Sequence, residues 1–294
     1  MIRAKADLLV PELLPFIIQN DALFDFAAGR SAGSLSPRVK WESLREYTFF
    51  LPPAEEQRKL AEALWSIEDT LQAYRRLIQE TENLVRAQFS EMFGDPMTNS
   101  KRLPSRKYGE LFALSAGGTP SKKHPEYWEG GTISWIGSNL CHDKVLYQND
   151  GACITEEGLR HSSARIFPPD TVLIALVGAT IGRTALLKFE TATNQNVLGI
   201  REIREAGFTP EYVFYHTQAI YGKFLERGAG FFMAPKGFIG QLDILCADLA
   251  AQEHFSRLAE QAEKSKSALH RAMVSLLETR RSLVSTALAG GRKE

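Results

Sequence analysis

Residues 52–96 read PPAEEQRKLAEALWSIEDTLQAYRRLIQETENLVRAQFSEMFGDP and decide the fold. The two prolines end a preceding strand and suit the first turn of a helix, and no further glycine or proline occurs before Gly94. Apolar residues recur at alternating steps of four and three, which is typical of a coiled-coil seam. The stretch therefore predicts a long spacer helix over 52–96, about 50–60 Å in length. Its seam residues are Leu60, Leu64, Ile67, Leu71, Tyr74, Ile78 and Val85.

A second, poorer seam predicts another long spacer helix over residues 250–294, ending near Gly290-Gly291. Helices of this length need a partner to cover their apolar sides, so we predict that the two form an antiparallel coiled coil. Two helices packed separately on a globular core, or a coiled coil between two chains, are the alternatives. The apolar seam residues of the second helix include Leu269, Met273, Leu276 and Leu283.

An internal repeat organises the rest of the chain. Residues 11–19 read PELLPFIIQ and residues 210–218 read PEYVFYHTQ. In both copies a glycine-bearing stretch, a short apolar segment and a long helix follow in the same order. The second copy has more than a hundred residues ahead of it. The repeat therefore predicts a complete domain over 97–249 and the remnant of a first such domain over 1–51.

Residues 97–249 change to short apolar runs separated by turn residues. Strands are predicted at 132–136, 171–177, 184–189 and 197–200, and helices at 156–159 and 210–225. The fold class is therefore α+β, with a mixed β-rich domain joined to the two long helices.

Composition narrows the classes of function. The 294 residues carry 35 Lys+Arg and 35 Asp+Glu, a formal net charge of +0, so a uniformly basic nucleic-acid surface is excluded and any such surface is local. The longest apolar run is about half of what a membrane-spanning helix requires. Three cysteines without a Cys-x-x-Cys pair are typical of a reducing compartment. We predict a soluble cytoplasmic protein that does not associate with membranes.

Motifs of catalysis are absent from the sequence. It contains no phosphate-binding P-loop, dinucleotide-binding fingerprint, nucleophile elbow or His-Glu-x-x-His motif. Cys141, His142, Cys153 and His161 have spacings that fit no standard zinc site. We therefore predict no catalytic site of its own, no cofactor and no metal.

Polar clusters in the β-rich domain suit binding to double-stranded DNA. The run GGTPSKKH at 117–124 combines glycine N–H groups, hydroxyls and lysines, which suit a phosphate backbone, although a solvated basic turn has the same composition. Asn and Gln pair with adenine and Arg pairs with guanine, although the same amides can close a buried loop. The candidate DNA-binding residues are Gly117, Gly118, Thr119, Ser121, Lys122, Lys123, Arg160, Ser162, Ser163, Asn194, Gln195 and Lys236.

The chain resembles the specificity (S) subunits of type I restriction-modification systems. The resemblance spans most of the chain in the family's order. The segments that carry it are LPPAEEQ at 51–57, FSEMFGDP at 89–96, GGTPS at 117–121, YWEGGTISWIGSNL at 127–140, ITEEGLRHSSARIFPPDTVLIA at 154–175 and TNQN at 193–196.

The resemblance implies a DNA-reading protein in which long helices join two target recognition domains. It also implies that the helices dock methyltransferase (M) subunits and, through the complex, a restriction (R) subunit. Only residues 97–249 match a complete recognition domain, so the chain resembles a truncated form. A second copy or a second half-specificity chain would complete it, and a degenerate subunit with impaired function is the third alternative. A coiled-coil scaffold that organises partner proteins without reading DNA is the alternative function.

Overall fold

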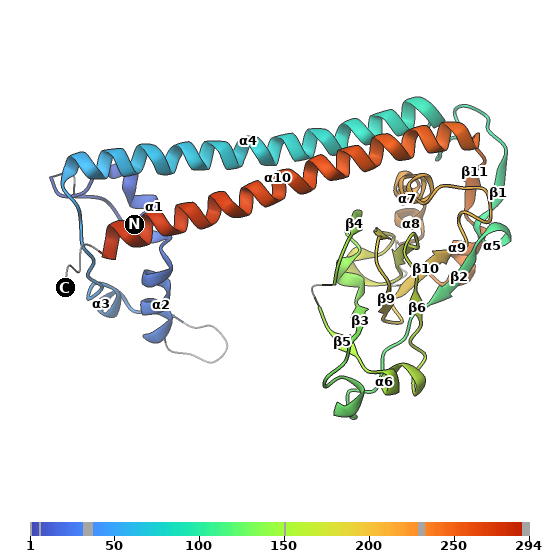
Figure 1. Ribbon diagram of the computed structural model, residues 1–294, viewed down its shortest axis with the longest axis horizontal. Coiled ribbons are helices and arrows are strands. Elements are labelled where there is room, and N and C mark those ends of the chain that lie inside the picture. The colour runs from blue at the N-terminus through green and yellow to red at the C-terminus, as the bar shows by residue number, and fades with distance from the viewer. Residues whose placement is uncertain (1, 6, 32–37, 150, 229–232, 290–294) are drawn as a thin grey trace. The chain divides into compact units, whose positions relative to one another are not determined.

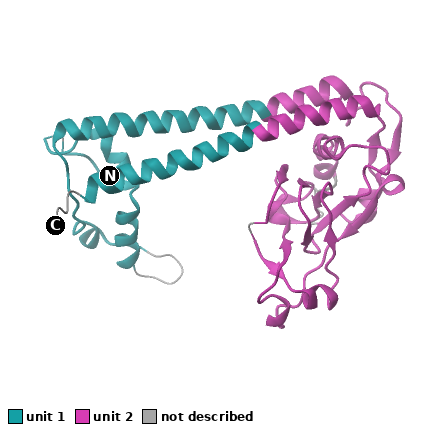
Figure 2. Cartoon of the chain, viewed as in Figure 1, with its two compact units in different colours: residues 1–81, 265–294 teal, residues 82–264 magenta. Residues whose placement is uncertain are grey.

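The computed structural model describes residues 2–5, 7–31, 38–149, 151–228 and 233–289. The chain divides into two compact units, Met1–Thr81 with Ser265–Glu294 (unit 1) and Glu82–Lys264 (unit 2), which Figure 2 distinguishes by colour. Two long helices, α4 (Ala54–Phe93) and α10 (Leu249–Ala289), each contribute one part to unit 1 and one part to unit 2. Within the described residues, no helix is both long and apolar enough to cross a bilayer.

The bounds of α4 and α10 follow from local chemistry. Helix α4 begins directly after Pro52-Pro53, and Glu55 and Glu56 lie in its first turn, where the helix dipole favours negative charge. It ends before Gly94, whose φ of 79° suits the left-handed position that terminates many helices. Helix α10 starts after Asp248, whose carboxylate accepts the N–H of Ala251. The two long helices predicted from the seams are present, while Gly290-Gly291 lie outside the described residues.

The two helices pack antiparallel within each unit. In unit 1, Leu64 of α4 belongs to the same buried cluster as Val284 and Leu288 of α10, and Glu68 forms an ion pair of 2.9 Å with Arg280. In unit 2, Val85, Phe89 and Phe93 of α4 belong to one cluster with Phe255 and Ala259 of α10. The antiparallel pairing predicted from the seams is therefore present.

The seam predicts the packed residues of α4 better than those of α10. Leu64, Leu71 and Val85 are buried. Leu283, which we expected on the seam of α10, is 36% exposed, and its neighbours Val284 and Leu288 are buried instead. The reason is that α10 ends against residues 9–17 as well as α4, so its packed face there is shifted by one residue toward Val284 and Leu288. The half-buried seam residues are Leu60, Ile67, Tyr74, Ile78, Leu269, Met273 and Leu276.

The sequence repeat has a structural counterpart in two buried glutamines. In unit 1, Gln57 accepts the N–H of Val10 (2.8 Å), and its amide donates to the carbonyl five residues earlier. In unit 2, Gln252 accepts the N–H of Thr209 (3.0 Å) and donates in the same way. Each glutamine lies in the first turn of a long helix and ties it to the start of a repeat copy. The two copies therefore share a local fold as well as a motif.

Unit 1 also contains short helices, and it lacks one predicted strand. Its helices are η1 (Pro11–Leu13), α1 (Leu14–Ile18), α2 (Asp21–Gly29) and α3 (Trp41–Leu44). The strand expected before Pro52 is absent, because residues 47–51 form no ladder in the described part of unit 1. The matching segment of unit 2, β11 (Asp243–Leu245), pairs with β1 (Ser105–Lys107). An extended segment becomes a strand only where a neighbour satisfies its backbone groups.

The β-rich domain of unit 2 contains two further sheets. One sheet has the order β2-β10-β7-β8-β4, and the other has the order β5-β3-β9-β6. All the pairings are antiparallel except β4 with β8 and β3 with β9. The bounds are β2 (Ala113–Ala116), β3 (Ile133–Ile136), β4 (Lys144–Leu146), β5 (Cys153–Ile154), β6 (Ile166–Phe167), β7 (Val172–Ala175), β8 (Thr184–Leu187), β9 (Thr191–Thr193) and β10 (Val197–Arg201).

Helices and short turns complete unit 2. A single helix was expected over 210–225, but the chain leaves helical geometry at the fully buried Ile220, which divides the span into two helices. The helix expected near 156–159 is present as α6. The elements are α5 (Tyr108–Leu111), η2 (Pro125–Tyr127), η3 (Ser138–Leu140), α6 (Glu156–Arg160), η4 (Gly178–Thr180), α7 (Pro210–Ala219), α8 (Tyr221–Gly228) and α9 (Lys236–Gln241).

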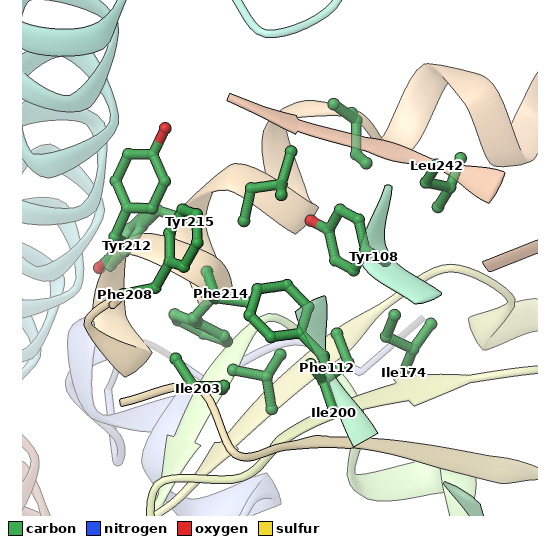
Figure 3. Close-up of a cluster of buried hydrophobic side chains, with 14 of the residues drawn as sticks. Tyr108, Phe112, Ile174, Ile200, Ile203, Phe208, Tyr212, Phe214, Tyr215 and Leu242 are labelled. Atoms are coloured by element: carbon green, nitrogen blue, oxygen red, sulfur yellow. The ribbon is translucent and has the colours of Figure 1, made fainter. Parts of the chain in front are cut away.

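The main core of unit 2 lies between α7 and the five-stranded sheet. Figure 3 shows Tyr108, Phe112 and Phe208 close to Phe214 and to Ile200 of β10, all within one buried cluster. All residues of β7 and β8 are buried, as expected for central strands covered on both faces. This core gives the loops at the strand ends a rigid base.

Candidate functional site

Three segments distant in sequence meet at one end of the β-rich domain: the loop after β2, the loop after α6 and the loop after β9. The N–H of Gly118 donates to the carbonyl of Thr193 (2.8 Å), and the Thr119 hydroxyl donates to Oε1 of Gln195 (2.5 Å). A Cβ added to Gly118 would lie 2.3 Å from the carbonyl carbon of Ser163. The structure therefore brings together three of the polar clusters that the sequence predicts. We call this junction the loop face.

The two glycines of the loop face have a packing role. Gly117 donates its N–H to the carbonyl of Val197 (3.1 Å), and the N–H of Gly118 is also bonded inside the protein. Both residues are buried. The prediction that their N–H groups bind a phosphate is therefore wrong, because those groups already have acceptors. Glycine is needed here because the backbone of 193–194 approaches within 2.3 Å of where a Cβ of Gly117 would lie.

The two amides of the β9–β10 loop have different surroundings. Asn194 is half-buried, its N–H donates to the carbonyl of Ile136 (3.0 Å), and its Oδ1 accepts the N–H of Asn196 (3.0 Å). It closes the loop, which was the structural alternative for this residue. Gln195 is exposed, and its Oε1 accepts from Thr119. Of the two, only Gln195 is exposed, and its side chain is held by the Thr119 hydroxyl.

Exposed polar and basic residues continue from the loop face. Lys122 and Lys123 are exposed in the turn that follows Ser121, and Arg160 is exposed at the end of α6. In the described part of the chain, none of these three cations has an ion-pair partner, so their charge is available to a ligand. Ser162 is half-buried and accepts the N–H of Ala164, while the neighbouring serine, Ser163, is exposed.

Acidic residues near α6 are paired with histidines. His124 contacts Glu126 at 2.9 Å, and His161 contacts Glu157 at 3.6 Å. Hydrogen bonds from its own backbone N–H and from His124 hold the pKa of Glu126 below its usual range. The ring of Tyr127 lies parallel to that of His161, with centroids 6.1 Å apart. The histidine rings thereby contact carboxylate oxygens beside the lysine turn.

Lys236 lies apart from the other candidates. It begins α9, which packs against α5, and Figure 1 shows both helices near β1 and β11, at a different end of unit 2 from α6. Lys236 is exposed and, among the described residues, forms no hydrogen bond or ion pair with the loop face. The structure therefore does not place it with the residues that meet around Thr119 and Gln195.

The cysteines and histidines considered for zinc do not assemble. Among the described residues, no group of three His, Cys, Asp or Glu side chains has the arrangement of a metal site. Cys141 is buried, and this burial, with a smaller effect from Asp143, raises the pKa of its thiol to about 12. Such a thiol is protonated at neutral pH.

Comparison with known proteins assigns the family. The family model described as type I restriction modification DNA specificity domain matches residues 103–272, which contain the loop face and both sheets. The chain belongs to this family. We refer to it below as the type I specificity family.

Curated members of the type I specificity family align with part of the chain. The MjaIX specificity subunit of Methanocaldococcus jannaschii is 35% identical over 132 residues, 43% of this chain and 30% of the relative. The EcoR124I/EcoR124II specificity subunit of Escherichia coli is 31% identical over 124 residues, 41% of this chain and 30% of the relative. The aligned segments therefore cover less than a third of the length of these two relatives.

Solved structures of type I systems share the fold of the chain. The S subunit from M. genitalium superposes with a TM-score of 0.61 at 12% identity, covering 96% of this chain and 73% of that chain. A structure described for the assembly and conformational transition of a type I system superposes with a TM-score of 0.56 at 19% identity, covering 98% and 73%. These likenesses confirm the α+β fold with long helices.

Two further exposed polar residues lie outside the candidate set predicted from the sequence. Arg165 is exposed shortly after the α6 loop, and Asn139 is exposed on η3 beside the β9–β10 loop. In the sequence, Arg165 follows RHSSA (160–164) and Asn139 ends SWIGSN (134–139), and these positions are the only sequence signal that marks the two residues as candidates. The loop face offers hydrogen-bond donors, acceptors and cations on one rigid junction, which is the chemistry needed to contact phosphates and base edges together.

Proposed function

We propose that the chain is the DNA-specificity subunit of a type I restriction-modification complex, without catalysis of its own. One observation carries the proposal: within a domain of the specificity family, the structure joins the loops of Thr119, Ser163 and Gln195 into one exposed face. Residues 97–249 would form one target recognition domain, and 1–51 would represent the end of another. The curated relatives are specificity subunits, which supports this assignment.

Contacts to phosphates and to bases have separate candidates on the loop face. Lys122, Lys123 and Arg160 are exposed cations suited to phosphate oxygens, which position a protein without reading sequence. Thr119, Ser163 and Gln195 are neutral donors and acceptors suited to base edges. This division agrees with a chain of zero formal net charge, because a local basic patch is sufficient.

Long helices α4 and α10 are proposed to carry the partner proteins. Leu77 and Leu84 of α4 are 52% and 66% exposed, and Val274 of α10 is 57% exposed, although all three are apolar. We assign these residues to the docking of methyltransferase subunits, through which a restriction subunit would join.

The length of the helices supports a spacing role. The 40 residues of α4 correspond to about 60 Å, or about 18 base pairs of DNA at 3.4 Å each. A spacer helix of that length suits a bipartite target with an unread interval.

A charge-reversal experiment tests the phosphate contacts. Lys122→Glu combined with Lys123→Glu should weaken binding to duplex DNA of any sequence and lower the salt slope by roughly 2, about 0.9 for each lost contact. Lys264→Glu, an exposed lysine of α10, is the control. Binding should be followed by anisotropy over a salt titration. An unchanged affinity and salt slope in the double variant would show that the lysine turn does not contact DNA.

A scaffold without DNA reading is the second candidate function. The exposed apolar residues of α4 and α10 favour it, since they fit protein partners regardless of DNA. Selection from a library of randomised duplexes separates the two functions. A specificity subunit enriches one motif, whereas a scaffold enriches none while still retaining its protein partners.

A further inference from the structure

We propose that Gln195 reads an adenine in the major groove and that Thr119 is the residue that positions it. The inference rests on the proposed function and goes beyond it by naming the reading residue and the base. It is built on the hydrogen bond between these two side chains, which come from loops 76 residues apart in the sequence.

The loop that carries Gln195 is fixed on both sides. Before it, Asn194 donates its N–H to the carbonyl of Ile136 and accepts the N–H of Asn196 on its side chain, both at 3.0 Å. After it, Val197 donates its N–H to the carbonyl of Asn194 (3.2 Å). Gln195 is therefore the exposed residue of a turn whose backbone is closed by its neighbours. Because the loop is already ordered, the entropic cost of ordering it on binding is small.

The loop that carries Thr119 is held by the same part of the β-rich domain. Gly118 donates its N–H to the carbonyl of Thr193, and the indole of Trp135 donates to the carbonyl of Gly118 (2.9 Å). The close approach of Gly118 to Ser163 leaves no room for a side chain. Thr119 and Gln195 are thus held by one junction, so their bond does not depend on a mobile loop.

The hydrogen bond determines which groups of Gln195 remain available. The Thr119 hydroxyl donates to Oε1, so the amide nitrogen Nε2 keeps both N–H groups for a ligand and Oε1 keeps a second lone pair. The free end of the side chain therefore presents a donor beside an acceptor. If the amide turned over, Nε2 would donate to the same hydroxyl oxygen, and the free end of Gln195 would still present a donor beside an acceptor.

Adenine has the matching edge. In the major groove it presents the N7 acceptor beside the N6 donor, and a glutamine amide satisfies both at once. Guanine presents two acceptors, cytosine a donor, and thymine an acceptor beside a methyl group. The fixed amide therefore favours adenine over the other three bases. Lys122 and Lys123 follow three and four residues after Thr119, where they can hold the adjacent phosphates.

Selection followed by base substitution tests the assignment. The full chain is first used to enrich a motif from randomised duplexes. At the adenine read by Gln195, 7-deazaadenine removes the N7 acceptor and purine removes the N6 amino group. Each should weaken binding of the unaltered chain by about 10-fold, within the roughly 10- to 100-fold expected for loss of a bidentate contact. With Gln195→Ala neither analogue should cause any further loss.

Matched variants separate reading from folding. Gln148→Ala removes another exposed glutamine of the same unit and should leave the motif unchanged. Thr119→Val keeps the shape of the side chain without the hydroxyl and should reduce preference at the same adenine only, while Thr119→Ser should restore it. A merely structural role for Thr119 would weaken every position of the motif equally.

The outcomes distinguish this inference from the proposed function. If the unaltered chain enriches no motif, the proposed function fails. If it enriches a motif that Gln195→Ala leaves intact, or if the loss is uniform across the site, the function stands and the assignment of Gln195 is overturned. Loss confined to one adenine, shared by Gln195→Ala and Thr119→Val, supports the assignment.

Discussion

At the scale of single residues, His216 shows how burial sets chemistry. It is fully buried on α7, and Leu245 donates its N–H to Nε2 (3.2 Å). The ring proton therefore lies on Nδ1, 3.1 Å from the hydroxyl oxygen of Tyr108. Tyr108 in turn contacts the hydroxyl of Thr217 at 2.9 Å. This buried relay ties the start of the β-rich domain to α7.

The pH dependence of stability should reflect His216. Burial, with a smaller effect from Lys223, lowers the pKa of His216 to about 3. Below about pH 6.5 the unfolded chain takes up a proton on this histidine, whereas the folded chain does not. The contribution of His216 to the free energy of unfolding is therefore fully present above that pH and is lost as the pH falls toward 3. We expect a slope of about 1.4 kcal/mol per pH unit between pH 6 and 4, measured by urea unfolding.

A variant separates this contribution from that of the carboxylates. His216→Gln should be less stable at pH 7, because it disturbs the relay, but its pH slope in that window should be shallower. Burial of Asp170 is outweighed by hydrogen bonds from Lys188 and Arg204, so the pKa of its carboxyl is lowered and its stabilising effect is lost only at more acidic pH. Equal slopes in the two proteins would exclude His216 as the cause.

Gly118 allows a test of packing at the loop face. Gly118→Ala would place a Cβ 2.3 Å from the carbonyl carbon of Ser163, so the loop after β2 and the loop after α6 would have to separate. We expect a loss of about 1–3 kcal/mol in the free energy of unfolding, measured with denaturant. Gly237→Ala on α9 is the control, since nothing lies within 4 Å of the added Cβ. If the two variants unfold alike, the loops are not held by this contact.

At the scale of elements, the pairing of α4 with α10 depends on a few buried side chains. Leu64 and Leu71 are fully buried in unit 1, whereas Leu77 on the same helix is 52% exposed. The repeat adds to this pairing, because the buried glutamines Gln57 and Gln252 tie the first turn of each long helix to a copy of the repeat. The helices are therefore anchored at their N-terminal ends.

A charge placed on the packed side of α4 tests this pairing. Leu71→Asp should lower the stability of unit 1 by about 3–5 kcal/mol, because it leaves a cavity and buries a charge without a partner. Leu77→Asp should leave the stability unchanged and weaken the binding of methyltransferase subunits. Circular dichroism melts and co-purification measure the two effects. Equal melting temperatures for the two variants would mean that Leu71 is not part of the packed side.

At the scale of the whole molecule, the repeat bears on the symmetry of the DNA target. Unit 2 contains the β-rich domain, whereas the named elements in the described part of unit 1 are all helices. Methylation mapping of genomic DNA, with and without this chain, should reveal one bipartite motif. Two copies of the chain predict identical half-sites in inverted orientation, and a second half-specificity chain predicts different ones. No change in methylation would contradict a role in directing a methyltransferase.

The sequence predicted the elements better than it predicted the site. Helix α4 follows from an uninterrupted seam between Pro53 and Gly94, and both signals act within a few turns of helix. Ile220 was not predicted as a break, since its cause is burial in a distant core. Likewise, nothing near Gly117 in sequence shows that its N–H is bonded to Val197, eighty residues away.

The sequence by itself determined the two long helices, the repeat, the strand-rich domain between them and the resemblance to its family, because periodicity, turn residues and motifs are local signals. Only the tertiary structure decided that Gly117 and Gly118 are packing residues, that Asn194 closes a loop and that Gln195 stays exposed beside Thr119. The physical reason is that exposure and hydrogen-bond partners depend on which distant segments meet, and Thr119 meets Gln195 because the sheets bring the loops after β2 and β9 together.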